Sequence, residues 1–105
     1  MAPEAAGTVL LTHPVGLHAR PSVKFTQLAR SFAAAVALAP DAAGPWIDAK
    51  SIVRVMAAKL PQHATLHIRA SGADAAEAVA ALVALVRDDF PDAAAGPERD
   101  DGGPA

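Results

Sequence analysis

The stretch Thr65-Leu66-His67-Ile68-Arg69-Ala70-Ser71 alternates polar and apolar side chains, a pattern typical of a β-strand with one face in a core. Gly72 ends this pattern. Beyond it, Asp74 and Glu77 resemble a capping box, and apolar side chains then recur at helical spacing as far as Phe90. The stretch therefore predicts a half-buried strand, a tight turn and a long amphipathic helix.

Shorter patterns predict three more strands and two more helices. The strands are expected at 8–12, 35–39 and 46–50, and the helices from Pro21 onward and from Ser51 to Ala58. Pro21 suits the first turn of a helix, and Ser51 can accept an N-cap hydrogen bond. The element order, β-α-β-β-α-β-α, favours an α+β sandwich with helices on one face of a mostly antiparallel sheet.

Length and composition point to one small domain. The chain has 105 residues, 52% of them apolar, with no cysteine and a formal charge of −2. We expect a flexible arm at 1–7, a folded domain at 8–90 and a disordered tail at 91–105. The missing cysteines exclude disulfides and thiolate metal sites, and the charge gives no case for nucleic-acid binding. With no targeting signal or apolar stretch of membrane-spanning length, we expect a cytoplasmic protein.

The motif Gly16-Leu17-His18-Ala19-Arg20-Pro21 is the first place to look for chemistry. It places an imidazole at a helix start, where backbone N–H groups and the positive end of the helix dipole favour anions. A guanidinium such as that of Arg20 grips phosphate, and a neutral imidazole is a competent nucleophile. From the residues alone, His18 is either a plain helix cap or a phosphoryl-accepting group.

Several segments together resemble the HPr family, the histidine-containing phosphocarriers of the bacterial phosphoenolpyruvate:sugar phosphotransferase system. They are the GLHARP motif with its helix, the segment Lys50–Met56, and Ser71–Asp74 with the final helix. The resemblance covers about residues 8–90. It implies an open-faced β-sandwich of HPr type, a four-stranded antiparallel sheet covered by three helices on one face.

The resemblance also implies roles for residues. His18 would take a phosphoryl group from phospho-enzyme I on Nδ1 and pass it to a sugar-specific enzyme II component, such as an enzyme IIA. Arg20 would stabilise the transferring group, together with the helix N-terminus at Ala19 and Arg20. The protein would be a monomeric carrier with no cofactor, rather than an enzyme with its own small-molecule turnover.

Two other functions fit the same residues. One is a regulatory paralogue, of a nitrogen-branch or non-transport system, whose phosphorylation state controls a partner. The other is a passive anion-binding module, against which the pairing of His18 with Arg20 argues.

Ser51 and its neighbours carry a second set of expectations. Ser51 matches the serine that an HPr kinase/phosphorylase modifies in many relatives, although it is equally suited to being only an N-cap. The expected docking surface for partners is a ridge beside the histidine, made by Ala19, Lys24, Gln27, Ile52, Val53 and Met56. The short helix can also contribute to the core, and we expect Val55 to point inward and Val53 outward.

The sequence departs from the family pattern at three positions. Val15 stands where relatives often have a polar residue, so His18 is expected to rely on backbone groups for its orientation. Lys59 and His63 stand where glycines are common, so we expect the turns there to be built differently.

The remaining histidines have no assigned role. A zinc site shared by His63 and His67 is improbable, because strand geometry separates residues four apart by about 13 Å. No metal is therefore expected, and His67 is predicted to face solvent. His13 ends the first strand, and nothing in the sequence gives it a function.

Overall fold

The computed structural model describes residues 3–14, 16–17 and 19–91. Its centre is a four-stranded antiparallel sheet in the order β1-β4-β2-β3. The strands are β1 (Glu4–Leu10), β2 (Ala35–Ala39), β3 (Ile47–Asp48) and β4 (Thr65–Ser71). The predicted strands at 35–39 and 65–71 are thus confirmed to the residue.

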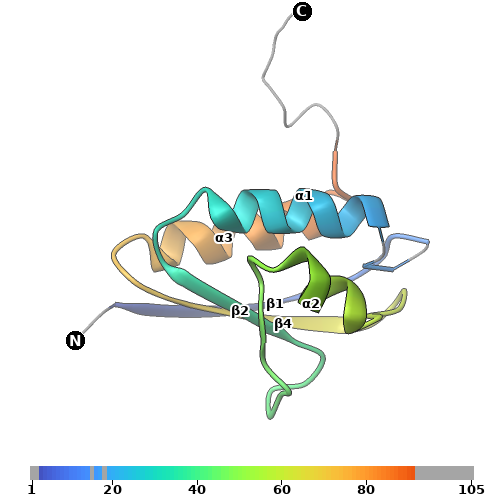
Figure 1. Cartoon of the computed structure of the whole chain (residues 1–105), viewed down its shortest axis with the longest axis horizontal. Coiled ribbons are helices and arrows are strands. Elements are labelled where there is room, and N and C mark those ends of the chain that lie inside the picture. Colours follow the sequence, from blue (N-terminus) through green and yellow to red (C-terminus); the bar gives the residue numbers. More distant parts are fainter. Residues whose placement is uncertain (1–2, 15, 18, 92–105) are drawn as a thin grey trace, which may run out of the picture.

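Three helices lie on one face of this sheet, and the other face is open (Figure 1). They are α1 (Ala19–Arg30), α2 (Ile52–Ala57) and α3 (Ala75–Arg87). α3 packs across β1 and β4, while α1 lies between α3 and α2. None of the helices in the described part of the chain has the length and hydropathy needed to cross a bilayer.

The core lies between the sheet and the helices, as the sequence patterns predict. Burial alternates along β4, with Leu66 and Ile68 fully buried and their neighbours facing the open side. α1 contributes Phe25, and α3 contributes Leu82 and Val86. The fold is therefore the open-faced sandwich that the sequence indicates.

The N-terminal boundary of the domain differs from the prediction. Residues 4–7, assigned to a flexible arm, belong to β1, which pairs with all of β4 from Glu4↔Ser71 to Leu10↔Thr65. Gly7 lies under α3, where a Cβ would come within 3.0 Å of Val79 Cγ1. The predicted tail at 91–105 lies outside the described residues except for Pro91, so its disorder stays a prediction.

The segment around α2 follows the prediction with shorter elements. β3 covers only two residues of the expected 46–50, because Asp48 Oδ1 accepts a hydrogen bond from Lys50 N–H and turns the chain toward α2. Ser51 Oγ accepts a hydrogen bond from Arg54 N–H at 3.3 Å, so Ser51 is the expected N-cap. Val55 is 0% exposed and Val53 is 75% exposed, which confirms their predicted directions.

The predicted capping box at the start of α3 is wrong. The Asp74 side chain makes no cap hydrogen bond to α3. Its two carboxylate oxygens accept instead from the backbone N–H groups of Ala33 and Ala34, at 2.9 and 2.8 Å. These two donors lie in the turn between α1 and β2, so the carboxylate joins segments that are far apart in the sequence.

The turns at Lys59 and His63 place non-glycine residues at left-handed positions of the backbone. Both residues adopt the left-handed conformation, with φ of 52° and 75°, which glycine would adopt at least cost. Two residues with side chains therefore hold a backbone conformation that is strained for them.

Candidate functional site

The loop between β1 and α1 carries the GLHARP motif and is held from both sides. Leu17 N–H donates to the carbonyl of Leu60 at 2.8 Å, and Gly16 N–H donates to the carbonyl of His13, also at 2.8 Å. Gly16 has a φ of 67°, and a Cβ at this position would collide with the carbonyl oxygen of Leu60. Only glycine allows this close approach of two backbone segments without displacement.

Buried contacts on α1 hold the end of the same loop. The Leu17 side chain is buried in the core, and the buried hydroxyl of Ser22 donates to the Leu17 carbonyl at 2.9 Å. These contacts fix the chain on the N-terminal side of the motif histidine. His18 itself lies outside the described residues, and so does Val15.

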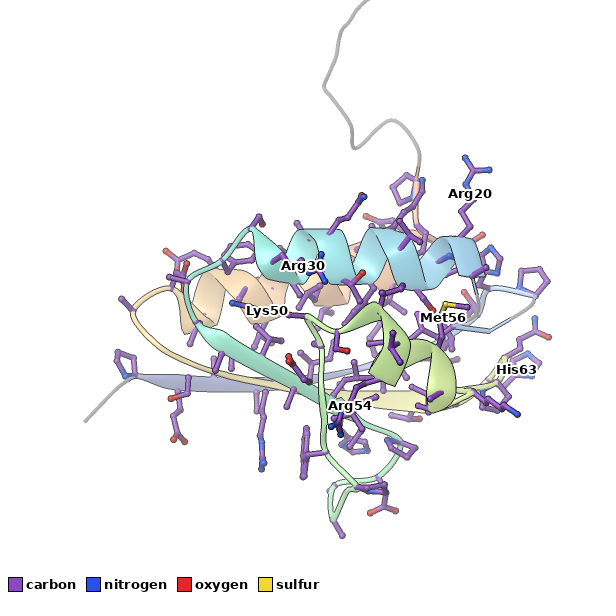
Figure 2. The ribbon with its side chains drawn as sticks, in the orientation of Figure 1. Arg20, Arg30, Lys50, Arg54, Met56 and His63 are labelled. Carbon is purple, nitrogen blue, oxygen red and sulfur yellow. The ribbon has the colours of Figure 1, made fainter. Side chains whose placement is uncertain are left out.

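The residues that follow His18 form the first turn of α1. The helix begins at Ala19, two residues before the predicted start at Pro21. First-turn N–H groups have no acceptor within a helix, and the positive end of the helix dipole lies there. Arg20 is exposed and projects from this turn away from the sheet (Figure 2). The turn thus presents positive charge directly after the motif histidine.

The residues proposed for docking come from two helices, α1 and α2. α1 packs against α2, and Met56 lies below Arg20 at the same end (Figure 2). Ala19, Gln27 and Val53 are exposed, whereas Ile52, Met56 and Lys24 are half-buried. Ile52 and Met56 are only partly covered, so part of each side chain packs in the core and part is exposed at the surface.

Ser51 lies in a basic environment beside the other end of α2. Arg30 Nε donates to the Lys50 carbonyl at 2.8 Å, and Lys50 Nζ donates to the Phe32 carbonyl at 2.8 Å. Figure 2 shows Arg30 and Lys50 next to each other between α1 and α2. A phosphate on Ser51 would enter a region where the positive charges of Arg30 and Lys50 favour it.

The other histidines are separated by the fold. His63 lies in the left-handed turn before β4, and His67 is a half-buried strand residue paired with Thr8. His13 lies in the loop after β1, where its ring meets the ring of Phe90 edge to face, 5.8 Å between centroids. Within the described ranges, no group of three or more histidine, aspartate or glutamate side chains is placed to hold a metal.

The sequence reasoning missed the position of Phe90 beside the loop that carries the motif. Phe90 is only 6% exposed and brings the end of the domain to the β1–α1 loop, and its carbonyl oxygen accepts from Lys24 Nζ at 3.1 Å. Phe90 was recognised as the last apolar residue of the helical pattern. Nothing in that pattern indicates that the chain turns back beyond the helix.

Comparison with known proteins agrees with this geometry. The family described as "PTS HPr component phosphorylation site" matches residues 6–88. The phosphocarrier protein HPr of Cupriavidus necator is 39% identical over 80 residues, covering 76% of this chain and 88% of that protein. The phosphocarrier protein NPr of Escherichia coli is 32% identical over 83 residues, covering 79% and 91%.

A solved structure shares the fold. The crystal structure of HPr-C-His from Thermoanaerobacter tengcongensis superposes with a TM-score of 0.76 at 31% identity, covering 82% of this chain and 94% of that one. The helices, the sheet and the matched region thus define a small phosphocarrier domain. The chain belongs to the HPr family of the phosphotransferase system.

Proposed function

We propose that this protein accepts a phosphoryl group from phospho-enzyme I on His18 and passes it to sugar-specific enzyme II components. The observation that carries this proposal is the first turn of α1, where Arg20 and the helix dipole follow directly after His18. The family match over residues 6–88 supports it. We further propose that the carrier acts as a monomer in the cytoplasm and needs no cofactor.

The chemistry required of the site is positioning and charge stabilisation. A nitrogen lone pair of the imidazole forms the new N–P bond while the bond from phosphorus to the donor breaks. The electron pair of the broken bond stays with the donor atom, and the three phosphoryl oxygens cross with the phosphorus. Charge spreads over these oxygens during transfer, so a nearby guanidinium and helix N-terminus lower the barrier.

A second function is kept because two kinds of relative match the chain. The HPr of Cupriavidus necator and the NPr of Escherichia coli cover nearly the same length at 39% and 32% identity. The alternative is a regulatory paralogue, of a nitrogen-branch or non-transport system, whose phosphorylation state controls a partner protein. Donor and acceptor preference distinguishes the two functions.

The test is intact mass after mixing with phosphoenolpyruvate and enzyme I, in the wild type and in His18→Ala. The proposal predicts a gain of one phosphate in the wild type alone, labile to acid and stable to base. A phosphate that persists in His18→Ala would overturn the assignment of His18. Transfer onward to a sugar-specific enzyme IIA supports the carrier, and transfer only to a nitrogen-branch acceptor supports the regulatory paralogue.

Docking is proposed on the ridge of Ala19, Lys24, Gln27, Ile52, Val53 and Met56. Its support is the exposure of Val53 and the packing of α1 against α2 at the end that carries Arg20. An acidic or apolar partner surface fits a ridge of this composition.

We propose Ser51 as a regulatory phosphorylation site for an HPr kinase/phosphorylase. The support for this proposal is the pair of basic residues beside the start of α2, since Arg30 Nε donates to the Lys50 carbonyl and Lys50 directly precedes Ser51. Incubation with such a kinase and ATP should add one phosphate to the wild type and none to Ser51→Ala. Equal labelling of the two proteins would remove Ser51 from the proposal.

A further inference from the structure

One row of side chains crosses the open face of the sheet from edge to edge. Arg69 of β4 is paired with Ala6 of β1 on one side and with Ala37 of β2 on the other. Ala37 is in turn paired with Asp48 of β3. Residues directly opposite each other in a sheet point to the same face, and Arg69 is exposed on the side away from the helices. The open face therefore carries a cation and an anion with an alanine between them.

The small side chains beside these charges leave a hollow in the open face. Its volume is about 1040 Å³, and its lining includes alanines at 6, 35 and 37 together with Arg69 and Asp48. None of the described helices covers this side of the sheet (Figure 1). The volume lies at the upper end of the range for ligand pockets, about 300 to 1,000 Å³. The hollow thus has room for several side chains of a partner.

The charged groups of the row are held in place without being paired with each other. The Arg69 Cζ lies over the Trp46 ring, 4.0 Å from its centroid. This contact uses the flat face of the guanidinium, whereas its five N–H donors lie around the edge. One oxygen of Asp48 accepts from Lys50 N–H. In the described part of the chain neither Arg69 nor Asp48 forms a salt bridge, so both charges remain available to a partner.

The spacing of the two charges matches one face of an α-helix. Neighbouring strands lie about 4.8 Å apart, so Arg69 and Asp48, which are two strands apart, are separated by about 10 Å. Residues seven positions apart in a helix lie on the same face, about 10.5 Å from each other. A helix with an acidic and a basic residue at this spacing would therefore meet both charges, and a residue between them would lie over Ala37.

We propose that the open face of the sheet binds a helix of a partner protein, with an acidic and a basic residue seven positions apart on one side. The acidic residue accepts from the Arg69 guanidinium, and the basic residue donates to Asp48. Opposite charges fix the register of the two surfaces. Because the sheet separates this face from α1 and α2, a second protein can bind here while the proposed docking ridge is occupied. The inference goes beyond the proposed function and does not depend on phosphoryl transfer.

The test uses the fluorescence of Trp46, which is half-buried beside Arg69 and is the only tryptophan of the chain. The probe is a synthetic alanine-rich helical peptide with Glu and Lys seven positions apart and leucine between them on the same face. Two control peptides carry Lys at both positions or Glu at both. The Glu–Lys peptide should bind the unphosphorylated full chain about fivefold more tightly than either control.

Arg69→Gln should weaken binding of the Glu–Lys peptide about fivefold, because it removes the cation and leaves the exposed position polar. The matched control is Arg87→Gln, which removes an exposed cation from α3, on the other side of the sheet, and should leave the affinity unchanged. Equal affinity for the three peptides, equal weakening by the two substitutions, or no binding of the Glu–Lys peptide overturns the inference.

Amide NMR shifts locate the bound peptide. The inference predicts shifts at Ala6, Ala37 and Arg69. Shifts at Gln27 and Val53 instead would place the peptide on the docking ridge and overturn the inference. Shifts on the open face that grow with protein concentration in the absence of peptide would assign this face to a second copy of the chain, which also overturns it. Failure of enzyme I to phosphorylate the protein concerns the proposed function alone, because no step of this test uses phosphate.

Discussion

The carboxylate of Asp74 accepts a hydrogen bond from the backbone N–H of Ala33 at 2.9 Å, across 41 residues of sequence. The second oxygen accepts from Ala34 at 2.8 Å. One side chain thus joins the turn before α3 to the turn after α1. The hydrogen bond from Ala33 is the main reason that the pKa of Asp74 lies below its ordinary value of 3.8.

This contact predicts a pH-dependent contribution to stability. The pKa of Asp74 is lower in the folded state than in the unfolded state. The contribution of Asp74 to stability is therefore fully present at a pH above its unfolded-state pKa, and it is lost as the pH falls through its folded-state pKa. At about pH 7, Asp74→Ala should therefore have a lower urea midpoint of unfolding than the wild type. At about pH 2.5 the difference between the two midpoints should be smaller. Glu77→Gln, in the same helix, is the control and should show no such narrowing. A gap of constant size would contradict the assignment.

The left-handed turns predict two stabilising substitutions. Lys59 and His63 hold positive φ without being glycine, which costs about 1 to 2 kcal/mol per residue. Replacement by glycine removes this strain, but it also raises the conformational entropy of the unfolded chain, which offsets part of the gain in stability. Lys59→Gly and His63→Gly should each raise the free energy of unfolding by about 0.5 to 1 kcal/mol. Lys59→Ala keeps the strain and should show no gain in the same denaturation experiment.

Val53 and Val55 form a matched pair on one helix. Val55→Ala removes two buried methyl groups and should lower the free energy of unfolding by about 1.5 to 3 kcal/mol. Val53→Ala should change stability by less than about 0.5 kcal/mol and weaken binding to enzyme I in a calorimetric titration. If Val53→Ala binds enzyme I as tightly as the wild type, the ridge does not include Val53.

Loss of the Arg20 side chain should change the rate of phosphoryl transfer but not the stability of the fold. Its exposed side chain makes Arg20→Ala neutral for folding, while loss of one charge-stabilising group should slow phosphoryl transfer by about 10- to 1000-fold. Rapid-quench measurement of transfer from phospho-enzyme I gives this rate. Arg69→Ala is the control for net charge, and equal rates in the two variants would rule out a special role for Arg20.

Most of the fold follows from local patterns in the sequence. The alternation at 65–71 and the helical spacing before Phe90 each arise from one face packed on the core, so they are visible along the chain. Ser51 likewise acts through nearby backbone, as the N-cap of α2. The resemblance of the GLHARP motif supplied the family, and the match over residues 6–88 confirms it.

The errors concern contacts between distant segments. Residues 4–7 were assigned to an arm, whereas they pair with β4, and Gly7 lies against the side chain of Val79 on α3. Asp74 had a local partner in the capping pattern and took a distant one instead. The contact of Lys24 with the Phe90 carbonyl depends on how α3 ends. The chain turns back there through Asp89 and Phe90, which have positive φ without being glycine, so the turn has no strong sequence signal.

The strand order has a consequence for how the protein is made. β4 lies between β1 and β2, although it is the last strand in the sequence. β1 and β2 each pair with β4 and not with each other. During synthesis both strands therefore stay unpaired in this sheet until residues 65–71 have left the exit tunnel of the ribosome. Formation of the sheet during synthesis is thus held back until β4 has emerged. While β1 and β2 are unpaired, their exposed edges can pair with strands of other chains. A short interval before β4 emerges, or a chaperone, would prevent this.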